Sequence, residues 1–189
     1  MGKLVVTEFI SLDGVIEDPG GAEGFERGGW AFQFDRGPEG DRFKLDELMA
    51  SDAQLLGRRT YDGFAKAWPS IEDDQGFAAR MNAMPKFVVS TTLEHGDWNN
   101  TTVLGGDLVS EVERLKERFE GDILVAGSAQ LVQSLLAVDL VDELRLMVFP
   151  VVLGAGKRLF ADAAGAATFA LADVRQAGAC AILTLRRGD

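Results

Sequence analysis

The sequence predicts an α/β fold built on a mostly parallel sheet. In the first 137 residues, short apolar segments rich in β-branched residues alternate with segments whose apolar residues recur at helical spacing. Strand-like segments then cluster near the C-terminus, which predicts an antiparallel end to the sheet. No internal repeat and no low-complexity linker interrupts the chain, so we expect a single domain over residues 1–189.

The first strand is predicted over residues 4–12, which are apolar and β-branched until Asp13-Gly14 breaks the pattern. Residues 17–40 then form a long glycine-rich loop that carries several aromatic side chains. A loop of that length in a compact domain is usually functional or disordered, and its aromatic residues favour function. We expect Trp30 and Phe32 in this loop to cover a substrate.

The later elements follow from the same two periodicities. Helical spacing of apolar residues, as in Leu108, Val112, Leu115 and Phe119, predicts helices over residues 39–50, 60–67, 108–119 and 130–137. Short apolar runs predict strands over residues 52–56, 86–92, 101–104 and 122–127, with the last strands in 140–149 and 169–185.

Composition restricts the function. The chain has 47% hydrophobic residues and a net charge of −11, which argues against a sequence-independent nucleic-acid binder. Cys180 and His95 are its only cysteine and histidine, so we predict no internal disulfide, no zinc site and no histidine-based triad. Acidic pairs such as Asp73-Asp74 are explained as solvated faces rather than metal ligands. No apolar run approaches the roughly 20 residues of a membrane span, and we expect a cytoplasmic protein.

Three polar turns follow predicted strands. They are Gly57-Arg58-Arg59-Thr60, Ser90-Thr91-Thr92 and Gly127-Ser128-Ala129-Gln130. Backbone N–H groups at glycine turns and helix starts bind phosphate, and so do arginine guanidinium groups. Open α/β sheets bind ligands beyond the carboxyl ends of their strands. Each turn alone is equally compatible with a tight turn bearing surface arginines or a capping serine. Together the three turns predict an elongated ligand with several phosphates, most plausibly a nucleotide.

Standard nucleotide motifs do not explain these turns. Neither glycine turn has the G-x-G-x-x-G fingerprint, and Gly154-Ala155-Gly156-Lys157-Arg158 lacks the spacing and the Ser/Thr of a Walker A loop.

Two carboxylates are further candidates for a site. Asp13 either holds a turn through the backbone or lies beside the ligand, and Glu8, a carboxylate within an apolar strand, needs a partner or a ligand.

Several motifs, in their order and spacing, resemble the dihydrofolate reductase superfamily. They are Ile10-Ser11-Leu12-Asp13-Gly14, Leu56-Gly57-Arg58-Arg59-Thr60-Tyr61, Lys86-Phe87-Val88-Val89-Ser90, Val125-Ala126-Gly127-Ser128 and Val141-Asp142-Glu143-Leu144. With the late segment Phe149–Gly156, the chain is most similar to the reductase domain of bifunctional riboflavin-pathway deaminase-reductases. The resemblance spans nearly the whole chain, and the zinc signature of the deaminase domain is missing. It implies a three-layer fold, with helices on both faces of the sheet and an antiparallel C-terminal strand pair.

The resemblance also implies NADPH as the cofactor. It places Gly57–Thr60 and Ser90–Thr92 near the adenosine 2′-phosphate and pyrophosphate, and Gly127–Gln130 near the remaining diphosphate and the nicotinamide. Arg58 and Arg59 would then select NADPH over NADH. Ser128 and Gln130 depart from the glycine and arginine that the dihydrofolate reductases usually have, which puts full cofactor affinity in doubt.

For chemistry, the resemblance implies hydride transfer to a small planar heterocycle, either a dihydrofolate or pterin or a 5-amino-6-ribosylaminouracil-type compound. Dihydrofolate reductases carry an acidic residue on the helix before the glycine-arginine turn, and ungapped counting reaches Asp41, with Glu8 as the other candidate. Asp41 is equally compatible with a carboxylate that stabilises a helix start. Relatives of the riboflavin type are commonly homodimers. The alternatives are a non-catalytic nucleotide- or flavin-binding module and an interaction protein that uses its aromatic loop.

Overall fold

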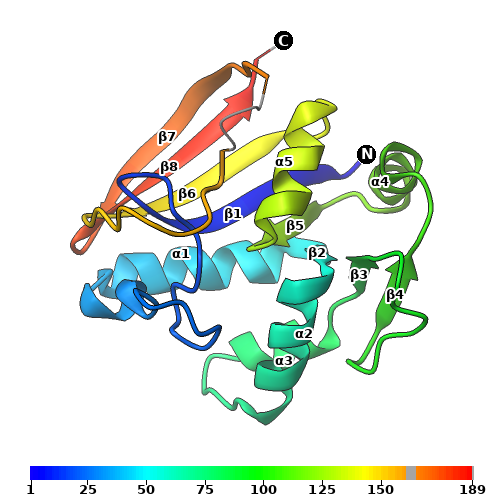
Figure 1. Ribbon diagram of the computed structural model, residues 1–189, viewed down its shortest axis with the longest axis horizontal. Coiled ribbons are helices and arrows are strands. Elements are labelled where there is room, and N and C mark those ends of the chain that lie inside the picture. Colours follow the sequence, from blue (N-terminus) through cyan, green and yellow to red (C-terminus); the bar gives the residue numbers. More distant parts are fainter. Residues whose placement is uncertain (161–164, 189) are drawn as a thin grey trace.

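The computed structural model describes residues 1–160 and 165–188, and in this part of the chain eight strands form one sheet (Figure 1). The strand order is β4-β3-β2-β5-β1-β6-β8-β7. The strands are β1 (Lys3–Ser11), β2 (Ser51–Gly57), β3 (Lys86–Val89), β4 (Thr101–Leu104), β5 (Asp122–Ala126), β6 (Glu143–Phe149), β7 (Phe169–Ala177) and β8 (Cys180–Arg187). The helices are α1 (Gly37–Ala50), α2 (Arg58–Ala67), α3 (Phe77–Ala83), α4 (Leu108–Arg118) and α5 (Ala129–Ala137), with 3-10 turns η1 (Trp30–Gln33) and η2 (Trp68–Ser70).

The sheet is parallel from β4 through β6 and antiparallel only at its C-terminal end. β1 pairs in parallel with both β5 and β6, whereas β8 runs antiparallel to β6 and to β7. Helical crossovers explain this arrangement, because parallel neighbours need a connection that returns the chain to the same end of the sheet. The predicted mostly parallel sheet with an antiparallel C-terminal strand pair is confirmed.

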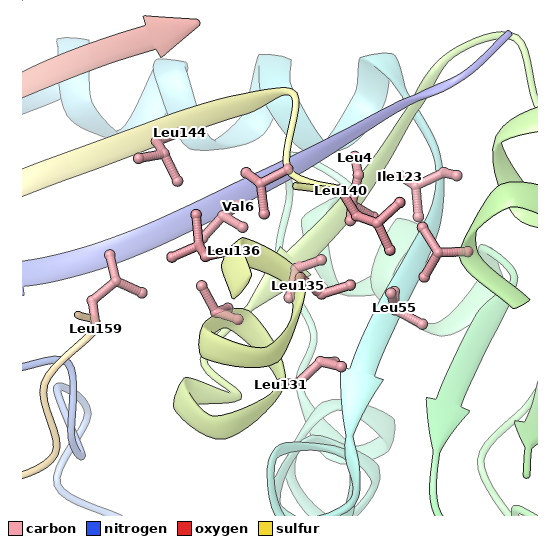
Figure 2. Packing of buried hydrophobic residues seen from close by; sticks show 14 of the residues in the cluster. Leu4, Val6, Leu55, Ile123, Leu131, Leu135, Leu136, Leu140, Leu144 and Leu159 are labelled. Carbon is pink, nitrogen blue, oxygen red and sulfur yellow. The ribbon is translucent and has the colours of Figure 1, made fainter. Parts of the chain in front are cut away.

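Helices cover both faces of the sheet, as predicted. On one face, Leu131 and Leu135 of α5 pack against Leu4, Val6 and other apolar residues of the strands (Figure 2). A second cluster on the other face joins α1, α2 and α3 to the sheet through Leu48, Tyr61 and Met81. β1 lies between these layers, and its near-continuous burial explains why its sequence is an almost unbroken apolar run.

The structure corrects several predicted boundaries. The strand predicted over 86–92 ends at Val89, because the Ser90 hydroxyl accepts hydrogen bonds from the backbone N–H groups of Thr92 and Leu93 and turns the chain. α2 begins at Arg58, two residues before the predicted start. The region expected as a loop over 17–40 contains η1 and the first turn of α1, and α3 was not predicted.

No helix in the described part of the chain combines the length and the apolar composition that crossing a membrane requires.

Candidate functional site

Two of the predicted anion-binding turns are joined by hydrogen bonds through Ser128. Its hydroxyl accepts from the Gly57 backbone N–H at 2.9 Å, and its own N–H donates to the Thr60 hydroxyl at 2.9 Å. Ser128 and Gly127 both have left-handed backbones, with φ of 58° and 60°. A Cβ at Gly127 would lie 3.0 Å from Thr60 Oγ1, so only glycine lets the two turns approach this closely.

The same two turns begin helices whose N-termini face the carboxyl edge of the sheet. α2 starts directly after Gly57 and α5 directly after Ser128, and neither helix start has a side-chain cap among the described residues. The first backbone N–H groups of a helix have no partner within the helix, and the macrodipole adds partial positive charge there. The arrangement is therefore suited to an anion.

Both predicted arginines lie in the first turn of α2 and are exposed to solvent. Arg58 Nε is 2.8 Å from both carboxylate oxygens of Asp62, which holds that guanidinium one turn from the helix start. Arg59 makes no ion pair within 4.0 Å in the described ranges. Burial and the charge of Asp18 raise the pKa of Glu23, in the long loop, and the charge of Arg59 lowers it.

The third predicted turn lies beside the first. Gly57 of β2 pairs with Val89 of β3. Ser90, the residue after Val89, therefore begins its turn beside the Gly57 turn. Ser90 is buried and its hydroxyl is used within its own turn, while Thr91 and Thr92 are exposed. The hydroxyl groups of Thr91 and Thr92 are the ones this turn offers to a ligand.

Glu8 lies where β1 loses one of its neighbours. The pairing of β1 with β5 ends at Thr7 and Ala126, whereas its pairing with β6 continues to Ser11. Glu8 is therefore the first residue of β1 beyond the β5 pairing, beside the Gly127 turn. This is the kind of position at which open α/β sheets bind ligands.

The Glu8 side chain is 6% exposed, and its Oε1 has no hydrogen-bond partner among the described residues. Burial raises the pKa of the Glu8 carboxyl well above its ordinary value, against the lowering effects of the Gly127 backbone and of the Lys44 charge. A buried carboxyl with an unused oxygen is suited to hold and release a proton.

A charged cluster that sequence reasoning missed lies on the opposite face of β1. Lys44 Nζ is 2.6 Å from both Thr7 Oγ1 and Glu47 Oε2, and the Thr7 hydroxyl donates to the same Glu47 oxygen at 2.8 Å. Arg145 Nη1 of β6 lies 3.5 Å from Glu47 Oε1. The signal in the sequence was Thr7, a polar residue in an apolar strand, because its side chain requires a polar partner on the helix that covers it.

Asp41, the other predicted catalytic residue, lies on α1 with an exposed side chain. Its Oδ1 accepts a 2.6 Å hydrogen bond from Arg36 Nε, and that guanidinium lies 5.2 Å from the centre of the Phe9 ring. Asp41 also lines a shallow hollow of about 560 Å³ together with Leu45 and Gln75. Neither burial nor an unused buried oxygen marks Asp41 as a proton donor, and its catalytic role stays a prediction.

Asp13 anchors a distant segment of the chain. Its carboxylate accepts hydrogen bonds from the Ser11 hydroxyl at 2.7 Å and from the backbone N–H groups of Leu153 and Gly154 at 3.0 and 2.7 Å. These bonds lower the pKa of Asp13 to about 2. The turn that Asp13 holds is thus the one after β6, and its predicted contact with substrate stays untested.

The two aromatic residues predicted to cover the substrate differ in burial. Trp30 is 1% exposed, and its ring packs edge-on against Phe149 with 5.4 Å between centroids. Phe32 is 78% exposed. In this conformation Trp30 belongs to the core, and a contact between its ring and a substrate would require its segment to move.

Comparisons with known proteins identify the family and the fold. Residues 2–183 match the model of the RibD C-terminal domain. The uncharacterized protein YyaP of Bacillus subtilis is 30% identical over 163 residues, which cover 85% of this chain and 81% of YyaP. The structure of a candidate riboflavin biosynthesis protein from Shewanella sp. PV-4 aligns with a TM-score of 0.79 at 22% identity, covering 99% of each chain.

Dihydrofolate reductase from Enterococcus faecalis, solved with NADP(H) and RAB-propyl, aligns with a TM-score of 0.58 at 16% identity and covers 100% of this chain and 98% of that one. The predicted dihydrofolate-reductase-like fold is therefore confirmed. The family match covers nearly the whole sequence and agrees with the resemblance that the motifs indicated. The chain belongs to the RibD C-terminal domain family.

Proposed function

We propose that this chain is an NADPH-dependent reductase that transfers a hydride to a small planar heterocycle. The observation that carries the proposal is the pair of helix starts tied together by Ser128, with Arg58 and Arg59 on one of them and the buried acid Glu8 beside the other. A phosphate-binding edge and a protonated carboxyl are the two components that such a reaction asks of the protein. Membership in a family named for the reductase half of RibD supports an oxidoreductase.

The residues present fit a phosphorylated dinucleotide. The close packing of Gly127 against the Thr60 side chain brings the two turns together, and the uncapped starts of α2 and α5 supply N–H donors. Arg58, Arg59 and Thr91 would hold the 2′-phosphate, and Gly127–Gln130 would hold the diphosphate. When bound, NADPH supplies the hydride.

Glu8 would supply the proton. Because burial raises its pKa, the carboxyl keeps its proton above the pH at which an exposed glutamate ionises and can pass that proton to a substrate. The unpartnered Oε1 leaves one carboxyl oxygen for a heteroatom of the substrate. After the transfer, burial of the new carboxylate favours its reprotonation from solvent.

The substrate that we propose is a dihydrofolate or pterin, or a 5-amino-6-ribosylaminouracil-type compound as in riboflavin biosynthesis. The fold shared with dihydrofolate reductase supports the first class, and the RibD family supports the second. The cytoplasmic location and the homodimer stay predictions.

The test is whether the purified protein oxidises NADPH in the presence of dihydrofolate, pterins or aminouracils. The absorbance of NADPH monitors the reaction. We expect turnover with at least one member of the panel and a large loss of that turnover in Glu8→Gln. Tight binding of NADPH without oxidation by any member would contradict the proposal and favour a non-catalytic nucleotide-binding module.

A further inference from the structure

We propose that Lys86 is a positioning residue for the first turn of α2, on which it acts through Trp98 and Tyr61. The inference rests on the proposed function, because that turn carries Arg58 and Arg59, the side chains that would hold the 2′-phosphate. Lys86 is fully buried, so its side chain does not contact a ligand itself. Its effect is on the geometry of the site and not on the chemistry.

The Lys86 ammonium is held by three backbone carbonyl groups. Its Nζ donates at 2.9, 2.8 and 2.9 Å to carbonyl oxygens of Asn82, Met84 and Asn99, which uses all three of its N–H groups. Removing an ammonium from water costs free energy unless other polar groups replace that water, and these carbonyls do so. Burial lowers the pKa of Lys86 to about 8, so the side chain is still mostly protonated at about pH 7.

The three carbonyl groups come from two different segments of the chain. Asn82 lies in the last turn of α3 and Met84 directly follows that helix, so their carbonyls have no partner within the helix. Asn99 lies in the turn before β4. Lys86, the first residue of β3, therefore joins the end of α3 to the turn before β4.

Two of the residues around the ammonium also fix α2. Trp98, whose ring centre lies 4.3 Å from Lys86 Nζ, donates its backbone N–H to the Tyr61 hydroxyl at 3.0 Å. Asn82, whose carbonyl binds the same ammonium, donates its side-chain N–H to the backbone carbonyl of Trp68 at 3.0 Å. Tyr61 lies at the end of the first turn of α2, and Trp68 is the residue directly after α2. The ammonium thus contacts the residues that hold both ends of this helix.

The contacts between the ammonium and α2 are closely packed. Tyr61 and Trp98 are both buried, and α2 and α3 lie side by side (Figure 1). A Cβ at Gly96 would lie 2.6 Å from the Tyr61 hydroxyl oxygen, so the turn before Trp98 packs directly against that hydroxyl. A displacement of Trp98 would therefore displace Tyr61 as well. The Thr60 hydroxyl is bound to Ser128 independently of the ammonium, so we expect the diphosphate end of the site to keep its geometry.

The test compares the affinities of NADPH and NADH for the wild type, Lys86→Met and Tyr61→Phe. The first variant removes the ammonium, and the second removes the hydroxyl that accepts from Trp98. We expect each to bind NADPH about five- to tenfold more weakly and NADH within about twofold of the wild type, since coupling through packed contacts is modest. The double variant should bind NADPH within about twofold of the weaker single variant, because both changes break the same series of contacts. Lys116→Met, at a buried lysine of α4, is the matched control and should change neither affinity.

Two further measurements separate positioning from a general loss of stability. In hydrogen exchange without cofactor, the amides of α2 should exchange faster in Lys86→Met relative to those of α5, and this difference should be missing in Lys116→Met. Lys86→Ala removes the atoms of n-propylammonium, so that ion should restore the NADPH affinity of Lys86→Ala, whereas n-propanol should not. If Lys86→Met does not fold, Tyr61→Phe and the restored Lys86→Ala decide.

The inference is overturned if folded Lys86→Met keeps the wild-type affinity for NADPH or weakens NADPH and NADH equally. It is also overturned if the effects of Lys86→Met and Tyr61→Phe on NADPH simply add, or if n-propanol restores binding as well as n-propylammonium does. A wild type that does not distinguish NADPH from NADH contradicts the proposed function instead. In that case the relative exchange of the α2 amides alone decides the role of Lys86.

Discussion

The backbone N–H of Ser128 donates a 2.9 Å hydrogen bond to the Thr60 hydroxyl, and this bond links the turn after β5 to the first turn of α2. These turns are far apart in the sequence and adjacent at one edge of the sheet. Their relative position determines whether the two helix starts can bind one ligand together.

Thr60→Val should therefore weaken both the fold and cofactor binding. The variant keeps the shape of the side chain but leaves the part-buried Ser128 N–H without its acceptor, which costs about 1–2 kcal/mol in the free energy of unfolding. Urea unfolding and titration with NADPH measure the two effects. Thr91→Val, at an exposed position in the neighbouring turn, is the control for stability and should leave the unfolding free energy unchanged. Wild-type stability together with wild-type NADPH affinity in Thr60→Val would refute this account of the contact.

Glu8→Gln should abolish most turnover while increasing stability at high pH. The folded carboxyl has a raised pKa, so it keeps its proton at pH values where the unfolded chain has released it. Its contribution to stability is full below the unfolded pKa, near the ordinary glutamate value of 4.5, and is lost as the pH rises toward the folded pKa. Glutamine is neutral throughout and has no such loss. Thermal unfolding is measured between about pH 5 and pH 9, and the melting temperature of the variant should rise relative to that of the wild type as the pH increases. If the two melting temperatures change in parallel, Glu8 is already ionised in the folded protein.

Asp41→Asn should have little effect on turnover. Its side chain is exposed and paired with Arg36, and among the described residues it makes no hydrogen bond or ion pair with the Gly57 or Gly127 turn. We expect kcat within about threefold of the wild type across pH, because removal of a true proton donor typically costs far more, about 10²–10⁴-fold. Steady-state kinetics at saturating substrate distinguish the two candidates. A loss in Asp41→Asn that lower pH restores would move the proton donor from Glu8 to Asp41.

Asp13→Asn should destabilise the fold by about 1–2 kcal/mol near neutral pH, since the amide oxygen is a weaker acceptor than a carboxylate and the amide NH2 cannot accept the hydrogen bonds made to the other carboxylate oxygen. The pKa of Asp13 is lowered to about 2, so its stabilisation is present above the unfolded pKa near 3.8 and is lost as the pH falls through 2. The difference in unfolding free energy between wild type and variant should therefore shrink in acid. A difference that is constant from about pH 7 to pH 2 would contradict the role of the charge.

Much of the fold was predictable because its signals are local. Alternation of apolar strands and amphipathic helices predicted the parallel sheet; glycine with adjacent polar residues marked the turns beyond β2 and β5, and a run of hydroxyl residues marked the turn beyond β3. α3 was missed because it has only seven residues and follows a polar stretch. Short helices are stabilised by packing, here through Ala78 and Met81, more than by their own sequence.

Within the site, the missed features depend on contacts between distant residues. Lys44 and Glu47 are three residues apart on a helix, a spacing that is equally common on solvated faces, and only the packing of α1 on β1 makes Glu47 a buried residue. Asp13 binds backbone groups 140 residues away at Leu153, which no local pattern indicates. Trp30 was expected over a substrate, and its place in the core depends on Phe149 of β6.

The most direct test of the central claim is the affinity of NADPH and NADH for the wild type and for Arg58→Ala/Arg59→Ala. Arg114→Ala on α4 controls for the loss of an exposed guanidinium. We predict that the double variant binds NADPH about 100-fold more weakly, because charged hydrogen bonds to the 2′-phosphate are lost, and that its affinity for NADH changes by less than about threefold. Equal losses for both cofactors, or a wild type that does not distinguish them, would contradict the assignment of this edge of the sheet to NADPH.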